Sequence, residues 1–377
     1  MRRKTTKSFT NSQKIVKIGR NKLRILFLLV SLPLALSVLS ACGAPAATQA
    51  PAAPATAEAP VEPSVQYPVQ YGQDSRAEIF QLTDTKLKGM AASVAVLVRP
   101  EQINISGNSV TLDGYTLNDM SEMGWLVEGT NVPMCSGELF TSQPAPGFCT
   151  GFLVNDDLLV TAEHCLQRTS CSNTIIVFGF QMESNDSFAP LTKDNIFKCT
   201  EVIAQTTPSQ DNQYLDYAIL KLDRPTGRKG LAYATDDHLT SQDNLAVLGY
   251  PSGLPQKIAS NAYVMTNDAN SPTFVTNLDT FGSNSGSPVI NTNIYQVEGI
   301  LVSGSTDYVL SGDGSCVRVN RCPEGGSITC AGETAVKMTM LAERISENAD
   351  RGANEFNCIP NLLLIFTLIA IMRLKIK

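Results

Sequence analysis

The stretch Gly282-Ser-Asn-Ser285-Gly-Ser-Pro288 places a serine among small residues just before an apolar run. Two earlier stretches complete a pattern: Thr161-Ala-Glu-His164-Cys165 and Leu215-Asp216-Tyr-Ala-Ile-Leu220. A serine hydroxyl is a poor nucleophile without an adjacent base, and an imidazole base needs a carboxylate that fixes its tautomer. Ser285, His164 and Asp216 supply those three groups, so the sequence predicts a hydrolase with a serine nucleophile.

Short β-type runs, separated by Gly, Pro, Asn and Asp, extend from about Pro133 to Val302. They cover residues 174–180, 217–222, 245–248, 273–276 and 297–302. Many short strands with turn signals between them are typical of an all-β barrel or sandwich. A further strand is expected over 91–98, and the apolar spacing from Glu333 to Asn348 predicts a helix that packs on the strands.

The three motifs, together with Cys149 and Cys165, resemble the trypsin-like serine peptidases. The segments Leu278–Val289 and Leu248–Pro255 look closest to the bacterial glutamyl-endopeptidase branch, which also has Asn before the serine and Ser-Pro after it. The resemblance covers about Cys135 to Ile345. It implies an all-β fold of two perpendicular, antiparallel, six-stranded barrels with a C-terminal helix and a site in the cleft between the barrels.

The resemblance also implies a role for each residue in the hydrolysis of peptide bonds through an acyl-enzyme. Ser285 would attack the scissile carbonyl, His164 would transfer the proton, and Asp216 would orient the imidazole. The backbone N–H groups of Ser283 and Ser285 would form the oxyanion hole. The expected partners are therefore protein or peptide substrates.

Two positions depart from the family pattern and keep a second interpretation open. Glu163 stands where the family has Ala or Gly, and a carboxylate there could compete with Asp216 for the imidazole. Ser283 stands where the family has Gly, which tolerates backbone conformations that are costly for other residues. The alternative is therefore a weak or inactive homologue that acts as a binding lipoprotein at the cell surface.

Three residues are candidates for the pocket that selects the substrate side chain at the cleaved bond. Asp279, six residues before Ser285, falls where trypsin has a carboxylate that favours Arg or Lys. Leu301 stands where acid-specific relatives often have a His, and Ser303 follows it. We therefore expect little preference for Glu at the cleaved position.

Ten cysteines in a chain with an export signal favour disulfides. We expect the pairs Cys149–Cys165 and Cys171–Cys199. The pairing of the others stays open: Cys135, Cys316, Cys322, Cys330 and Cys358. The Cys and His spacings of zinc sites are absent from the sequence, so we predict no metal and no cofactor.

The N-terminus predicts export and anchoring. A basic segment and an apolar run end in Leu39-Ser40-Ala41-Cys42, which resembles the lipobox of bacterial lipoproteins and implies lipidation of Cys42. The predicted location is thus the surface of a bacterial membrane, facing the exterior or the periplasm. The formal charge is −6, and residues 1–41 hold nine of the bases and no acid, so the acidic remainder argues against nucleic acid as a partner.

These features divide the chain into five segments. We predict a signal peptide over 1–41, a tether rich in Ala and Pro over 42–70, and an N-terminal extension over 71–132. A peptidase domain over 133–348 and a C-terminal tail over 349–377 follow. The apolar run 362–372 in the tail is shorter than the roughly 20 residues of a membrane-spanning helix, and association of this tail with the membrane stays open.

Overall fold

The computed structural model of the protein describes residues 70–206, 215–322 and 331–348. The predicted signal peptide, Cys42, nearly all of the tether and the C-terminal tail lie outside these ranges. None of the helices within them is long and apolar enough to cross a bilayer.

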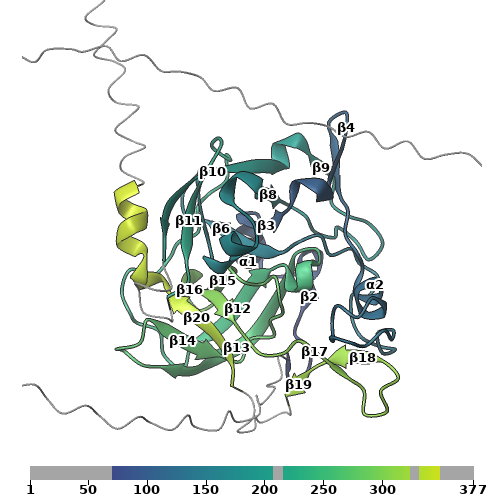
Figure 1. The fold of residues 1–377 in the computed structure, drawn as a ribbon. Helices are drawn as coiled ribbons and strands as arrows, with labels where there is room; N and C mark the ends of the chain where they lie inside the picture. Colours follow the sequence, from purple (N-terminus) through teal and green to yellow (C-terminus); the bar gives the residue numbers. More distant parts are fainter. Residues whose placement is uncertain (1–69, 207–214, 323–330, 349–377) are drawn as a thin grey trace, which may run out of the picture. The chain divides into compact units, whose positions relative to one another are not determined.

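Six antiparallel strands close the first barrel in the order β10-β11-β7-β6-β3-β8 (Figure 1). Five of these strands are buried along nearly their whole length and read as apolar runs, whereas β10 exposes polar residues such as Lys198 and Glu201. The strands are β3 (Val94–Val98), β6 (Cys149–Leu153), β7 (Leu158–Thr161), β8 (Ile175–Phe178), β10 (Ile196–Gln205) and β11 (Ala218–Leu222).

The second barrel has the order β12-β15-β16-β20-β14-β13 and is closed by pairing of β12 with β13. A short strand, β2 (Ala77–Glu78), adds to β13. The strands are β12 (Asn244–Gly249), β13 (Lys257–Asn267), β14 (Thr273–Thr276), β15 (Pro288–Asn291), β16 (Gln296–Ser303) and β20 (Glu333–Lys337). The prediction of two six-stranded antiparallel barrels is confirmed.

Part of the expected C-terminal helix is a strand. Residues Glu333–Lys337 form β20, which is hydrogen-bonded to β14 on one side and β16 on the other. A 3-10 turn, Met338–Met340, follows, and helix spans only residues 342–348 of the described chain. The helical spacing of Val336, Leu341 and Ile345 misled the prediction, because pairing with two distant strands overrides a local pattern.

Strand β3 of the first barrel lies within residues 71–132, the predicted N-terminal extension. Strand β3 lies between β6 and β8, and all five of its residues are buried. The barrel therefore begins well before residue 133, the expected start of the peptidase domain. Residues 71–132 also hold α1 (Thr85–Ala91), α2 (Leu117–Glu122) and the pair β4 (Ile103–Ser106) and β5 (Ser109–Leu112).

The remaining elements join distant parts of the chain. Strand β1 (Gln70–Tyr71) pairs in parallel with β19 (Arg321–Cys322), β9 (Leu191–Thr192) pairs with β5, and β17 (Tyr308–Leu310) forms a hairpin with β18 (Val317–Val319). A disulfide between Cys135 and Cys316, whose Cα atoms are 4.9 Å apart, fixes this hairpin to the segment after α2. Helix α3 (His164–Arg168) directly follows β7.

Candidate active site

Asp216 holds His164 through two hydrogen bonds. Its Oδ2 lies 2.6 Å from Nδ1 of the imidazole, and its Oδ1 accepts the backbone N–H of His164 at 3.1 Å. His164 is the first residue of α3, and Asp216 lies just before β11, which pairs with β7. An ionised carboxylate only accepts hydrogen bonds, so Nδ1 carries the proton and Nε2 is the nitrogen that can accept one.

Ser285 lies in the loop before β15, and its backbone is hydrogen-bonded to the first barrel. The N–H of Thr150 on β6 donates to the carbonyl of Ser285 at 2.9 Å. The next residue, Gly286, has φ of 89°, and a Cβ there would lie 2.0 Å from the Thr150 carbonyl oxygen. Glycine at this position therefore allows the serine loop to approach the first barrel.

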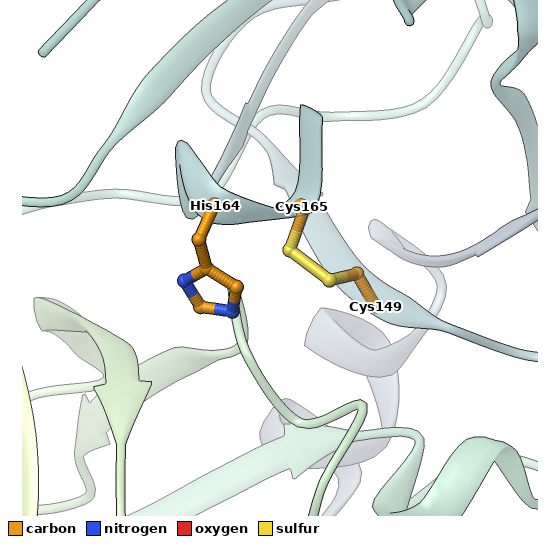
Figure 2. A group of neighbouring side chains, drawn as sticks. All are labelled: Cys149, His164 and Cys165. Carbon is orange, nitrogen blue, oxygen red and sulfur yellow. A yellow bond between two sulfur atoms is a disulfide. The ribbon is translucent and has the colours of Figure 1, made fainter. Parts of the chain in front are cut away.

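A disulfide links β6 to α3 on the first-barrel side of the site. Cys149 and Cys165 are bonded, with Cα atoms 6.1 Å apart, and Cys165 Sγ lies 3.8 Å from the carbonyl oxygen of Ser285. Figure 2 shows the imidazole of His164 beside this disulfide. The two sulfurs and the imidazole lie within 4.8 Å of one another, but sulfurs joined to each other are not the thiolates that bind a metal. The structure also joins Cys171 to Cys199.

His164, Ser283 and Ser285 line one cavity of about 510 Å³. The hydroxyl of Ser285 and the imidazole are not hydrogen-bonded to each other in the described structure, as is common in peptidases without a bound substrate. Other lining residues are Met120, Trp125, Leu126, Arg168, Ser252, Thr280, Phe281, Gly282, Glu333 and residues 301–308.

Ser283 adopts the left-handed backbone conformation that its position demands. Its φ is 67°, a conformation that costs a residue with a Cβ roughly 1–2 kcal/mol. Its carbonyl accepts the hydroxyl of Thr150 at 2.9 Å, and its own hydroxyl donates to the carbonyl of Gly147 at 3.2 Å. Neither Ser283 N–H nor Ser285 N–H has an acceptor within the described ranges, so both are available to a ligand.

Glu163 does not compete with Asp216 for the imidazole. Its Oε2 accepts the side-chain amide of Gln167 at 2.7 Å, one helical turn along α3. Glu163 is buried and Gln167 is exposed, and the carboxylate of Glu163 makes no hydrogen bond to His164 within the described ranges.

Of the three predicted pocket residues, Leu301 and Ser303 line the cavity and Asp279 does not. Asp279 is 3% exposed, and its two oxygens accept the N–H of Tyr71 at 2.7 Å, the N–H of Ser75 at 2.8 Å and the hydroxyl of Ser75 at 2.6 Å. The N-terminal segment thus supplies three donors to Asp279, and the role of Asp279 in the pocket stays a prediction.

Two acids that the sequence reasoning missed line the cavity instead. Glu333 begins β20, and burial raises the pKa of its carboxyl well above the ordinary value. Burial also raises the pKa of Asp307 to about 6, although the N–H of Gly282 donates to its Oδ2 at 2.7 Å. Glu333 was missed because the sequence predicted a helix over Glu333 to Asn348, and a residue of that helix would not belong to the barrel wall.

The comparisons with known proteins agree with this fold. Residues 149–300 match the family described as the trypsin-like peptidase domain. Among curated proteins, none matches the sequence.

Three solved structures are similar. A Glu endopeptidase is 17% identical, with a TM-score of 0.42 over 74% of this chain and 99% of its own. An inactive form of Rv3671c from M. tuberculosis is 13% identical, with a TM-score of 0.38 over 74% and 96% of the two chains. The VesB protease of Vibrio cholerae is 13% identical, with a TM-score of 0.44 over 74% and 68%.

The two closed barrels and the family match together define the class. The chain carries a trypsin-like serine peptidase domain with a chymotrypsin-like fold. Its disulfides are those of an exported protein, because such bonds persist in oxidising compartments.

Proposed function

We propose that this protein is a serine endopeptidase whose nucleophile, base and orienting acid are Ser285, His164 and Asp216. The observation that carries the proposal is the pair of hydrogen bonds that His164 donates to Asp216, on the wall of a cavity that Ser285 also lines. Such an arrangement fixes the imidazole with Nε2 as the proton acceptor.

In the acylation step, Ser285 Oγ attacks the scissile carbonyl carbon as its proton moves to His164 Nε2. The C–N bond then breaks, and the imidazolium returns that proton to the leaving amine. Water repeats the sequence on the acyl-enzyme: His164 takes a proton from water, the hydroxide attacks the ester, and Ser285 leaves with that proton. The carboxylate of Asp216 stabilises the imidazolium in both steps.

The N–H groups of Ser283 and Ser285 are the proposed donors to the oxyanion. Donors that need no rearrangement lower the barrier most, and loss of one typically costs about 100- to 1000-fold in rate. The left-handed conformation of Ser283 supports this role, because the residue has taken up the backbone geometry for which the family uses glycine. This geometry and the pairing of Glu163 with Gln167 favour the enzyme over the inactive binding homologue.

A fluorophosphonate probe tests the proposal. We expect covalent labelling of the disulfide-bonded protein and its loss in Ser285→Ala. Ser252→Ala is the matched control, since it removes another serine hydroxyl from the same cavity, and it should label as the parent does. Labelling that survives Ser285→Ala, or its absence from correctly folded protein, would reject the mechanism.

We also propose that the enzyme is anchored to the outer face of a bacterial membrane through lipidated Cys42. The sequence Leu39-Ser40-Ala41-Cys42 supports this, and the region that follows is rich in Ala and Pro, as in an extended tether. Metabolic labelling with an alkyne fatty acid should mark the parent protein in membrane fractions and not the Cys42→Ser variant. Equal labelling of both would refute the anchor.

A further inference from the structure

Helix α2 ends in a turn that brings Trp125 beside its last residues. The backbone N–H of Trp125 donates to the carbonyl of Met120 at 2.8 Å, and the N–H of Gly124 donates to the carbonyl of Ser121 at 2.9 Å. Gly124 has φ of 73°, the left-handed conformation in which glycine commonly terminates a helix. This pair of hydrogen bonds turns the chain back toward the helix, so Trp125 lies next to Met120.

Met120, Trp125 and Leu126 line the cavity that also contains His164 and Ser285. We call these three uncharged residues the α2 wall. Trp125 is 59% exposed, although an indole has a large apolar surface to bury. Single exposed apolar residues are ordinary, but several that lie together in the wall of a cavity are typical of a ligand-binding surface.

The α2 wall is fixed to the second barrel. Leu117 of α2 is buried in a cluster with Phe281, from the loop before the nucleophile, and with Tyr308 of β17, and all three residues of the α2 wall except Trp125 pack against this cluster. The disulfide between Cys135 and Cys316 joins the following segment to the same hairpin. A surface that is already ordered binds a ligand without the cost of ordering it.

The α2 wall belongs to an unusually long connection between neighbouring strands. Strands β3 and β6 pair in antiparallel fashion, and residues 99–148 connect them. Two residues are enough to join such strands, and connections this long are usually functional. The connection lies before residues 149–300, which match the trypsin-like peptidase domain. The α2 wall is therefore an addition to the part of the chain that matches the family.

We propose that the α2 wall binds a large apolar side chain of the substrate, within two residues after the cleaved bond. The inference rests on the proposed peptidase function. Leu301 and Ser303 line the cavity as the proposed pocket for the residue before the bond. His164 gives its proton to the leaving amine, so the residues after the bond start beside His164 and extend along the remaining wall. A Phe or Leu side chain there covers the indole and removes apolar surface from water, whereas Ser or Asp does not.

The first test uses peptides built around a bond that the parent protein cleaves, with Phe, Leu, Ser or Asp at the first or second position after that bond. We expect the parent to prefer Phe and Leu. Trp125→Ala should lower kcat/KM for the Phe peptide about 10-fold, the effect of leaving part of an aromatic side chain in water. For the Ser peptide the change should stay below about threefold. Trp125→Phe, which keeps an aromatic ring, should restore most of the preference.

Tyr263→Ala is the matched control. Tyr263 is also an exposed aromatic residue, at 50%, but it lies on β13 and does not line the cavity. It should leave the ratio of Phe to Ser cleavage unchanged. Unfolding by urea should show that Trp125→Ala protein is folded, because replacement of an exposed side chain costs little stability. An equal loss for Phe and Ser peptides in Trp125→Ala, or a preference confined to positions before the bond, would overturn the assignment.

A fluorescence measurement separates this inference from the proposed function. Trp125 is the only tryptophan of the chain, so its emission reports on the α2 wall without catalysis. The probes are the amides of Phe-Leu and Ser-Gly, which mimic the leaving half of a substrate, added to Ser285→Ala protein. Phe-Leu amide should shift the emission to shorter wavelength and reduce quenching by acrylamide, and Ser-Gly amide should do neither. That result supports the subsite even if no peptide is cleaved. Binding of Phe-Leu amide, measured by calorimetry, with no change in emission overturns the inference while the peptidase stands.

Discussion

Asp216→Asn is the change that most clearly isolates the proposed catalytic geometry. The side chain keeps its size and can still offer an oxygen to the backbone N–H of His164, now 3.1 Å from Oδ1. Its NH2 group then faces Nδ1 in place of the acceptor that lies at 2.6 Å. Nδ1 must become an acceptor, so the proton moves to Nε2, and Nε2 no longer takes the proton of Ser285.

The expected loss in kcat is about 10⁴-fold near neutral pH, or roughly 5 kcal/mol at 1.36 kcal/mol per tenfold change. The assay is the initial rate on a chromogenic peptide substrate that the parent protein cleaves, with unfolding by urea measured in parallel. Because the substitution is nearly isosteric, stability should change far less than activity. The substrate KM should change little, since Asp216 does not line the cavity.

Glu163→Gln serves as the control for this prediction. It neutralises the carboxylate next to His164 in sequence, but that carboxylate bonds Gln167. Its rate should stay within about threefold of the parent. If Asp216→Asn keeps a tenth of the parent activity, or if Glu163→Gln loses as much, then the hydrogen bonds of Asp216 do not set the tautomer and the reasoning fails.

Three further outcomes follow from the site and its supports. Ser283→Gly should raise the unfolding free energy by up to about 1 kcal/mol, because a φ of 67° suits glycine. The rate should stay within about threefold of the parent, because the backbone N–H of residue 283 is already free. A large gain in rate would mean that the serine distorts the oxyanion hole. Replacing Cys149 and Cys165 together with Ala opens a loop of 16 residues and should lower the urea-derived free energy by about 3 kcal/mol; an unchanged value would contradict the bracing role. The folded pKa of Asp307 is raised to about 6 from 3.8, so its contribution to stability is present below the unfolded value and is lost as pH rises through about 6. Asp307→Asn should remove that decline from the pH–stability curve, and parallel curves for the two proteins would refute the assignment.

The sequence was informative where function depends on short, contiguous motifs. His164, Asp216 and Ser285 each stand in a stretch whose neighbours mark it as a candidate, and short apolar runs predicted β3, β8, β11, β12, β14 and β16. The pairing of Cys135 with Cys316, 181 residues apart, has no such local signal.

The substrate pocket lay beyond sequence reasoning for a related physical reason. The offset of Asp279 from Ser285 suggested a pocket acid, but hydrogen bonds from Tyr71 and Ser75, more than 200 residues away, determine where its carboxylate points. The spacing of apolar residues around Glu333 predicted a helix, so the sequence did not indicate that Glu333 lines the cavity. It does so because β20 pairs with β14 and β16.

The most direct test of the central claim is a crystal structure of the protein after reaction with a peptidyl phosphonate. The account predicts a bond from phosphorus to Ser285 Oγ, with Nε2 of His164 within hydrogen-bonding reach of that oxygen. The phosphonyl oxygen should lie about 2.7–3.1 Å from the N–H nitrogens of Ser283 and Ser285. Phosphorus on any other residue, or an imidazole out of reach of Ser285, would contradict it.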